Sequence, residues 1–519
     1  MRVLIFHGYL LSGTGSNVYN ASLARALAAL GHDVHLLCQD REARGYEWVD
    51  AFGDWSAGAL RVERLREAQP GPGTVTAYVP DIGGVLPVCV RDRYAGFEVR
   101  TFTEIGDAEL ERYIEANVRA VRDVVSAIGG AEAALANHLV MGPVILARAG
   151  LRYALKVHGS DLTYAVLPEL ERFRPYAEEA CAAANGILVG SAHIAERLRA
   201  AVDDPATNAK VRLGPPGVDT ELFRPLPRAD GPVRLREAAA RLRALAPGEA
   251  GEGGGSSWDR DPREAAALLE WLPAAPAGRV AYVGKLIVSK GVDLLLAAWP
   301  LAHARASGSR LLVAGFGAYR DALERLAAAL AAGRVGDALA IAERGWALEG
   351  GEERPLPILS AFLREAPPGY AEACAQAAGT VAFAGRLEHD EVAAVLPACD
   401  ALAFPSTFPE AFGMVAAEAA ASGTLPVCAA HSGALEVSRA LAEALPAAHA
   451  GLVSFPVDER AVPALARALG EWLAAPERDR EPTRAALRDV VMRRWSWESV
   501  ASVVLAASAG ELGSLPVPA

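Results

Sequence analysis

The stretch RVAYVGKLIVSKGVDLLLAAW, residues 279–299, decides the fold because it contains a strand, a loop and the start of a helix. Residues 279–283 are a short apolar run typical of a buried strand, and the helical spacing of apolar residues begins after Gly291. A strand followed by a short loop and a helix is the building unit of a parallel sheet covered by helices. This stretch therefore predicts an α/β domain.

The loop within this stretch is unusually rich in lysine. It holds Lys285 and Lys290, two of only four lysines in a chain whose other basic residues are all arginine. Two ammonium groups beside the free amides of a helix N-terminus form a site for a polyanion, most simply a diphosphate. The alternative is that both lysines only solvate a surface loop, and the loop alone does not decide between the two.

The same unit occurs at the start of the chain. RVLIF (2–6) is a buried strand, a glycine-bearing turn follows at 8–17, and a helix over 18–31 leads to a second strand at 32–40. Further strands are expected at 133–138, 153–159, 186–191, 310–317, 380–385, 401–406 and 425–430. The fold class is α/β, with two Rossmann-like, doubly wound domains that face each other across a cleft.

The boundaries follow from changes in composition. The first domain spans 1–225 and the second 279–494, with a linker or insert at 226–278 between them. Residues 248–264, rich in glycine and charge, are typical of a flexible segment. Residues 318–379 are too long for a simple connection and are interpreted as helices with an inserted element.

Composition excludes several classes of protein. The chain has 519 residues, 52% of them hydrophobic, and a net charge of −12, so it lacks the basic excess of a nucleic-acid-binding protein. Its six cysteines are widely spaced without a CxxC pair, which favours free thiols in a reducing cytoplasm. We expect neither a signal peptide nor a spanning helix, and peripheral contact with a membrane stays open.

A second motif carries acidic residues. In FPSTFPEAFGMVAAEAAASGTLPV (404–427), Glu410 and Glu418 are separated by seven residues, and Gly413 is expected in the first turn of a helix. Glu410 would then lie at the helix mouth beside free amides, and Glu418 deeper on the same helix. Two acceptors at two depths suit two sets of hydroxyls, on a sugar and on a ribose. The alternative is a dipole-stabilising Glu410 and an exposed Glu418.

These motifs together resemble family-4 retaining glycosyltransferases of the GT-B fold, the group that includes glycogen synthase and sucrose synthase. FPEAFGMVAAEAAASGTLPV resembles the family's E-x7-E element, and VGKLIVSKGVDLLLAA resembles its G-R-L-x-x-x-K-G element, with Lys285 in place of the usual arginine. HSGALEV (431–437) follows in the expected order, and the terminal WSWESVA (495–501) matches the family's closing helix. The first-half matches VHGSD (157–161), VGSAHIAERL (189–198) and GPPGVDTELFRP (214–225) are individually weaker. The family has a C-terminal helix that returns to the first domain, which is expected here at about 495–519.

The resemblance implies roles for individual residues. Lys285 and Lys290 would hold the diphosphate of a nucleotide sugar, Glu410 would lie at the donor sugar, and Glu418 would bind the ribose hydroxyls. His158 would lie at the reacting centre, which makes Glu410, His158, Lys290 and Lys285 the candidate catalytic residues. Further donor contacts are expected from Arg386, Leu387, Phe412, Gly413 and Met414, and from Gly13 and Gly15.

The function that this resemblance implies is retaining transfer of a sugar from a nucleotide-diphosphate sugar to an acceptor, which could be a small molecule, a glycan or a lipid. No cofactor and no metal site are expected, since DRD (259–261) is interpreted as solvated linker charge. The basic segment 61–69 is interpreted as an exposed helix face. Alternatives are a catalytically silent nucleotide-sugar-binding protein, an epimerase or phosphorylase of the same fold, and a nicotinamide oxidoreductase.

Overall fold

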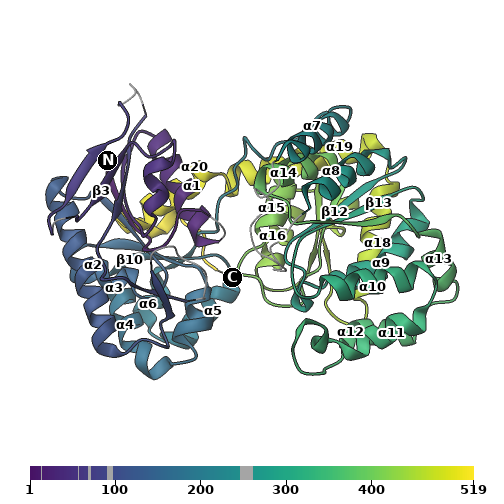
Figure 1. Cartoon of the computed structure of the whole chain (residues 1–519), viewed down its shortest axis with the longest axis horizontal. Helices are drawn as coiled ribbons and strands as arrows, with labels where there is room; N and C mark the ends of the chain where they lie inside the picture. Colours follow the sequence, from purple (N-terminus) through teal and green to yellow (C-terminus); the bar gives the residue numbers. More distant parts are fainter. Residues whose placement is uncertain (13–14, 57, 68–71, 90–96, 246–260, 519) are drawn as a thin grey trace. The chain divides into compact units, whose positions relative to one another are not determined.

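The computed structural model describes residues 1–519 except 13–14, 57, 68–71, 90–96, 246–260 and 519. The chain forms two compact units, and Figure 1 labels many of their elements. The first unit contains Met1–Gly217 together with Trp495–Ala519, and the second contains Val218–Arg494. None of the helices in the described part of the chain has the length and apolar character needed to cross a bilayer.

The described residues of the first unit form a nine-stranded sheet in the order β11-β10-β9-β8-β1-β2-β5-β3-β4. Its strands are β1 (Arg2–Phe6), β2 (Asp33–Leu37), β3 (Ala51–Asp54), β4 (Arg61–Arg64), β5 (Val75–Val79), β8 (Ala133–Asn137), β9 (Tyr153–Val157), β10 (Ala184–Val189) and β11 (Val211–Leu213). All five strands predicted in this half are present. From β1 the chain proceeds to β2 on one side and later to β8 on the other, so the strand order reverses at β1.

Helices flank this sheet and complete the Rossmann-like pattern. They are α1 (Ser16–Ala29), α2 (Asp107–Ala127), α3 (Gly142–Arg148), α4 (Leu170–Ala183), α5 (Ala192–Ala201), α6 (Pro205–Lys210) and α20 (Trp497–Ala509). The last of these, α20, belongs to the core of the first unit: Val500 and Val504 pack with Leu23 and Leu135. Ser508 accepts a hydrogen bond from the Ala134 amide of β8 at 3.0 Å. The predicted return of the C-terminal helix is therefore confirmed.

The interpretation of residues 61–69 as a helix face is wrong. Arg61–Arg64 form strand β4, which pairs antiparallel with β3 at the edge of the sheet, and all four residues are exposed. An edge strand with both faces in water has no buried side, so its sequence lacks the apolar alternation that identifies a strand. The small sheet of β6 (Val85–Val88) and β7 (Glu98–Thr101) was also not predicted.

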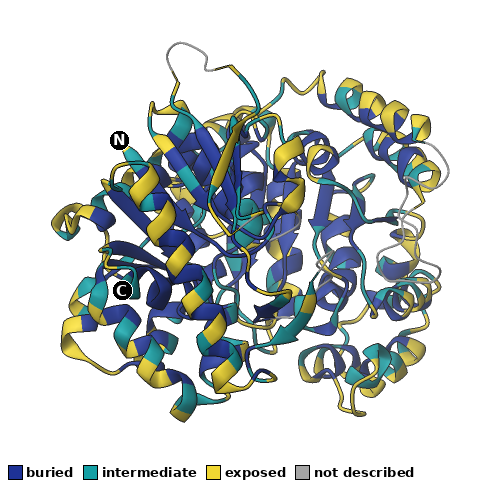
Figure 2. Cartoon of the chain, turned by 60° about the vertical axis from the view of Figure 1, so that its left-hand side comes forward, coloured by how far each residue is buried: buried dark blue, intermediate teal, exposed yellow. Residues whose placement is uncertain are grey.

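The described residues of the second unit form a six-stranded, wholly parallel sheet in the order β14-β13-β12-β15-β16-β17. Its strands are β12 (Arg279–Val283), β13 (Arg310–Ala314), β14 (Val381–Gly385), β15 (Ala401–Phe404), β16 (Leu425–Ala429) and β17 (Ser454–Phe455). The first five were predicted. These strands are largely buried, which is why their sequences are continuous apolar runs. Most strand arrows in Figure 2 are dark blue, the colour of buried residues.

Helices cover this sheet. They also make up most of the described parts of residues 226–278 and 318–379, the two segments that the sequence pattern separated from the domain cores. Residues 318–379 contain α10 (Arg320–Ala331), α11 (Val335–Arg344), α12 (Pro357–Arg364) and α13 (Tyr370–Gln376). Residues 226–278 contain α7 (Gly231–Ala244) and α8 (Pro262–Trp271). The end of the predicted flexible segment is thus helical, and most of the rest lies outside the described residues. Of DRD, only Asp261 is described; its carboxylate caps α8 by accepting from the Arg263 and Glu264 amides.

The remaining helices are α9 (Val292–Arg305), α14 (His389–Val395), α15 (Met414–Ala421), α16 (Ser432–Ala442), α17 (Ala447–Ala450), α18 (Ala461–Ala474) and α19 (Glu477–Arg494). Helix α19 carries a row of arginines at a spacing of four, which places them on one face. Arg480 and Arg484 each lie 3.0 Å from the carboxylate of Asp400, a residue that is only 2% exposed. Arg488 donates to the carbonyl oxygens of Thr220 and Phe223. This face therefore fastens α19 to the sheet and to the first residues of the unit.

We expect Asp400→Asn to destabilise the second unit by about 3–5 kcal/mol, because it removes the buried carboxylate that neutralises Arg480 and Arg484. Urea unfolding followed by tryptophan fluorescence measures this change. Asp458→Asn, which breaks the exposed pair with Arg460, serves as the matched control and should leave the unfolding midpoint unchanged. Equal midpoints for the two variants would contradict the role assigned to Asp400.

Candidate functional site

The candidate site lies at the carboxyl ends of the parallel strands of the second unit. The chain leaves β12 toward β13 and β14, then returns to β15 on the other side of β12, so the strand order reverses between β12 and β15. Loops that follow such a pair of strands diverge and leave a crevice, where ligands of open α/β sheets bind. The lysine loop follows β12, and the segment with Glu410 follows β15.

Backbone contacts hold these two loops together. The Ser289 carbonyl oxygen accepts hydrogen bonds from the amides of Thr407 at 2.9 Å and Phe408 at 3.2 Å. Gly291, the N-cap of α9, has φ 64°, and a Cβ there would lie 2.1 Å from the Pro405 carbonyl oxygen. Only glycine accommodates both this backbone conformation and this close approach. The expected helix start at Gly291 is confirmed, and the glycine also sets the distance between the loops.

The two lysines of the loop have different surroundings. Lys290 Nζ lies 2.5 Å from Glu410 Oε1, and both side chains are mostly buried, with exposed fractions of 28% and 17%. Lys285 is exposed and has no ion-pair partner within the described residues. The structure therefore joins Lys290 and Glu410, which are 120 residues apart in the sequence, and leaves the Lys285 ammonium available to an anion.

Glu410 is fixed by its backbone. Its amide donates to Ser432 Oγ at 2.8 Å, and its carbonyl oxygen accepts from the Gly433 amide at 2.9 Å. Ser432 has φ 50°, a conformation that side-chain-bearing residues adopt mainly where surrounding contacts impose it. The sequence indicated only the stretch that contains them, HSGALEV (431–437), and gave neither residue a role, because both lie beyond β16 and contact Glu410 only in the tertiary fold.

Helix α15 starts slightly later than predicted. Gly413 is its N-cap, with φ 130°, and Met414 is its first residue, so Gly413 does not lie in the first turn. The amides of Ala411, Gly413 and Met414 make no hydrogen bond within the described residues. Phe412 is buried, at 6% exposed. The helix start thus presents unbonded donors next to Glu410, a geometry that favours a bound oxyanion.

Glu418 is not an exposed helix glutamate, so that alternative is wrong. It is 6% exposed in a helix composed mainly of alanine, and its Oε1 lies 3.1 Å from His389 Nε2. Burial lowers the pKa of His389, but the hydrogen bond and the negative charge of Glu418 outweigh it, so the pKa lies above 6.5. His389, which packs edge-on against Phe223, is a contributor to the site that the sequence did not indicate.

The other predicted donor contacts follow β14. Arg386 pairs with Glu388 at 2.8 Å and lies over the Phe316 ring, and Leu387 is half-buried. Gly315, after β13, donates its amide to the Gly385 carbonyl oxygen. These residues occupy the same sheet edge as Lys290 and Glu410.

His158 lies in the first unit, at the carboxyl end of β9. Its Nε2 is 2.8 Å from Asn137 Oδ1, and its ring is 4.8 Å from that of His138. Burial, reinforced by His138, Lys156 and His7, holds the pKa of His158 well below 6.5, so its imidazole is neutral at physiological pH. His7 and His138, which follow β1 and β8 at the strand reversal, were not expected to contribute here.

The predicted glycine loop is only partly described. Gly15 is the N-cap of α1 with φ 60°, a conformation that favours glycine. Gly13 lies outside the described residues.

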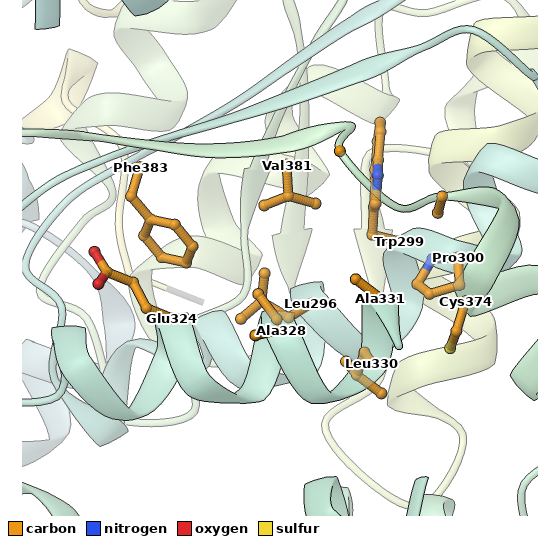
Figure 3. A pocket seen from close by; sticks show the side chains of 13 residues that line it. Leu296, Trp299, Pro300, Glu324, Ala328, Leu330, Ala331, Cys374, Val381 and Phe383 are labelled. Atoms are coloured by element: carbon orange, nitrogen blue, oxygen red, sulfur yellow. The ribbon is translucent and has the colours of Figure 1, made fainter. Parts of the chain in front are cut away.

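A cavity of about 250 Å³ lies elsewhere in the second unit (Figure 3). Its lining is mainly apolar and comes from α9, α10, α13 and β14, with Trp299, Leu330 and Phe383 among the contributors. The lining contains none of the predicted site residues.

Comparisons with known proteins bear on both the fold and this site. Residues 371–489, which include Glu410 and Glu418, match the family model described as "Glycosyl transferases group 1". No curated protein sequence matches the chain.

Solved structures match over nearly the whole chain. A glycosyltransferase from Rickettsia africae ESF-5 is 12% identical, with a TM-score of 0.56 and coverage of 99% of both chains. Sucrose-phosphate synthase from Thermosynechococcus elongatus is 19% identical, with a TM-score of 0.51 and coverage of 97% of this chain and 96% of the other. Anabaena Alr3699/HepE, solved with UDP and glucose, is 14% identical, with a TM-score of 0.52 and coverage of 99% and 100%. This chain therefore has the GT-B fold, with two Rossmann-like domains.

The Glu418–His389 pair can be tested by titration. We expect proton NMR to give His389 a pKa above 6.5 and Glu418→Gln to lower it, because the substitution removes the carboxylate that stabilises the imidazolium. Since the folded-state pKa is raised, the pair contributes stability below about pH 6.5, and this contribution is lost as pH rises through the folded-state pKa. The His389→Gln spectrum assigns the resonance. A His389 pKa unaffected by Glu418→Gln would rule out the pair in solution.

Proposed function

We propose that this protein is a retaining glycosyltransferase that moves a sugar from a nucleotide-diphosphate sugar to a hydroxyl-bearing acceptor. The observation that carries the proposal is the contact between Lys290 and Glu410 at the strand reversal of the second unit, beside the unbonded amides of α15. A cation, a carboxylate and a helix start in one place suit a ligand that combines phosphates with sugar hydroxyls. The group 1 family match over 371–489 and the UDP in the HepE structure support the same class of donor.

The chemistry follows from the charges that develop during transfer. When the bond between the anomeric carbon and the phosphate oxygen breaks, negative charge grows on the diphosphate and positive charge on the sugar. Lys285, Lys290 and the α15 amides would stabilise the leaving diphosphate, and Glu410 would hold sugar hydroxyls. Glu418 would accept hydrogen bonds from the ribose. Arg386, Leu387, Phe412, Gly413 and Met414 are proposed as further donor contacts.

Retention is proposed on the family resemblance. The acceptor oxygen attacks from the face that the diphosphate leaves, and the departing phosphate oxygen takes the acceptor proton, so no enzyme nucleophile and no cofactor are needed. His158, neutral at physiological pH, would orient or polarise groups at the reacting centre. Gly13 and Gly15 are proposed to approach phosphate and acceptor. The acceptor could be a small molecule, a glycan or a lipid, which also leaves peripheral membrane contact open.

A cytoplasmic location is proposed as well. All six cysteines are buried and free, and burial raises the pKa of Cys38, Cys181, Cys399 and Cys428 to about 12, so these thiols are protonated and unreactive. Unpaired thiols of this kind suit a reducing compartment.

The proposal is tested by substituting the central pair. We expect Glu410→Gln to slow transfer by at least about 10²-fold, because it removes a charged contact to the sugar, while nucleoside diphosphate still binds because Lys290 has lost its competing carboxylate. Lys290→Ala should weaken both binding and rate. Turnover with a panel of nucleotide sugars and calorimetry with UDP, ADP and GDP measure the two effects.

Controls separate the proposal from its alternatives. Glu372→Gln, on an exposed residue of α13, should behave as wild type, and Lys285→Arg should stay active, since the related family has arginine at that position. Wild-type binding of a nucleoside diphosphate without any turnover would indicate a catalytically silent binding protein. Wild-type rates in both Glu410→Gln and Lys290→Ala would show that the site is elsewhere.

Substitution of Gly433 tests whether sugar transfer depends on the position of Glu410. A Cβ on Gly433 would lie 2.6 Å from the backbone of Phe412, so Gly433→Ala must displace the segment that carries Glu410. We expect transfer to fall on the order of 10²-fold while the far-ultraviolet circular dichroism stays unchanged. Gly451→Ala is the matched control, because no atom lies within 4 Å of its Cβ position. Full activity in Gly433→Ala would contradict a positioned Glu410.

A further inference from the structure

A second cluster of charges lies at the amino-terminal ends of the strands in the second unit. A small cavity there is lined by Arg228, Arg279, Asp400 and Arg484. Arg279 is the first residue of β12, and Asp400 directly precedes β15. The cavity thus occupies the same pair of strands as the candidate active site, at their opposite ends.

The decisive observation is the Arg279 side chain. The residue is only 8% exposed, and its guanidinium has no hydrogen bond and no ion pair within the described residues. Its backbone is fully engaged instead: the Arg279 amide donates to Asp400 Oδ2 at 3.0 Å, and its carbonyl oxygen accepts from the Asp400 amide. A guanidinium is always charged and carries five donors, and the Arg279 side chain lines the cavity, so its donors are open to an acceptor bound there.

The neighbouring ion pairs do not supply that acceptor. Asp400 Oδ1 is shared by Arg480 and Arg484 at 3.0 Å and by Arg228 at 3.5 Å. Glu477, the other carboxylate of the cluster, accepts from the same three arginines at 2.7–2.8 Å. These contacts place three guanidinium groups around two carboxylates, and none of them involves the Arg279 side chain.

A purely structural cluster would explain only part of this arrangement. Arg480, Arg484 and Arg228 fasten α19 and the segment near residue 228 to the sheet through Asp400, and they need no ligand for that role. The Arg279 side chain holds no other segment in place, because it makes no hydrogen bond or ion pair to a described residue. A residue that only filled space at this position would not need a charge.

We propose that this cavity is an oxyanion site, in which Arg279, Arg228 and Arg484 bind a phosphate group, either inorganic phosphate or a phosphate monoester. The planar fork of a guanidinium suits two oxygens of one phosphate, and several such forks provide both charge balance and geometry. The site is separate from the Lys285–Lys290 loop. Gly284, the first glycine of that loop, follows Arg279 by five residues, a span of about 17 Å at roughly 3.3 Å per residue.

The position of the site in the chain suggests what a bound anion would affect. Arg228 follows the unit boundary at residue 217 by eleven residues, and Arg484 precedes the boundary at residue 494 by ten. Both segments that connect the units therefore contribute a ligand. A bound phosphate would cross-link these two segments to β12 and stabilise the second unit.

The test is phosphate binding by the full-length chain, measured by calorimetry and by thermal stabilisation against chloride at equal ionic strength. To exclude the first anion site, the measurement is repeated in Lys285→Ala/Lys290→Ala, where phosphate stabilisation should persist. In that background we expect Arg279→Met to weaken phosphate binding at least about tenfold and Arg228→Gln to weaken it severalfold. Glycerol 3-phosphate, tested in parallel, distinguishes a monoester site from one that accepts only inorganic phosphate.

A matched control comes from the neighbouring strand. Arg310 pairs in register with Arg279 but donates to the Trp271 carbonyl oxygen and stacks on the Trp271 ring, so Arg310→Met should keep phosphate binding. Arg228, which is 43% exposed, provides a variant that folds even if Arg279→Met does not. The proposal is overturned if phosphate fails to bind the lysine double variant, or if neither Arg279→Met nor Arg228→Gln weakens binding there.

Discussion

The parallel pairing of β12 with β15 is the constraint on which the second unit depends. These strands begin 122 residues apart, at Arg279 and Ala401, yet Val280 lies opposite Ala401 in the sheet. Because parallel strands end at the same edge, the pairing brings the lysine loop beside the segment that carries Glu410. The ion pair between Lys290 and Glu410, the contacts of Ser289 and the close approach at Gly291 all follow from this adjacency.

Most charged side chains at that edge are paired with one another, and a bound ligand could take the place of one partner in each pair. Lys290 is paired with Glu410, Glu418 is hydrogen-bonded to His389, and only the exposed Lys285 lacks a partner within the described residues. Under the proposed function, a nucleotide sugar would replace each internal partner with one of its own groups: phosphate oxygens for Lys290, sugar and ribose hydroxyls for the glutamates. Such an exchange leaves no charged group without a partner, because the phosphate would pair with Lys290 and the hydroxyls would donate hydrogen bonds to the carboxylates.

At the opposite, amino-terminal ends of the same strands, the charges are not balanced in pairs, because arginines outnumber carboxylates. There, the buried carboxylate of Asp400 is surrounded by arginines from α19 and from the start of the unit, and Arg279 has no acceptor. This imbalance is the physical basis for proposing a second anion site. One sheet thus supports two clusters of charge, separated by the length of β12.

The sequence by itself determined the α/β class, the two repeated halves and most strands of the parallel sheets, because strands buried on both faces must be continuously apolar. It did not indicate β4, whose exposed residues need no pattern, or the helices in 226–278, which lie on either side of a glycine- and charge-rich stretch and were assigned with it to one linker. It indicated Lys290, Glu410 and Glu418 as site candidates, but their partners Ser432, Gly433 and His389 were decided only by the tertiary structure. The physical reason is that a side chain's partner depends on strand order and register, which local apolar patterns do not encode.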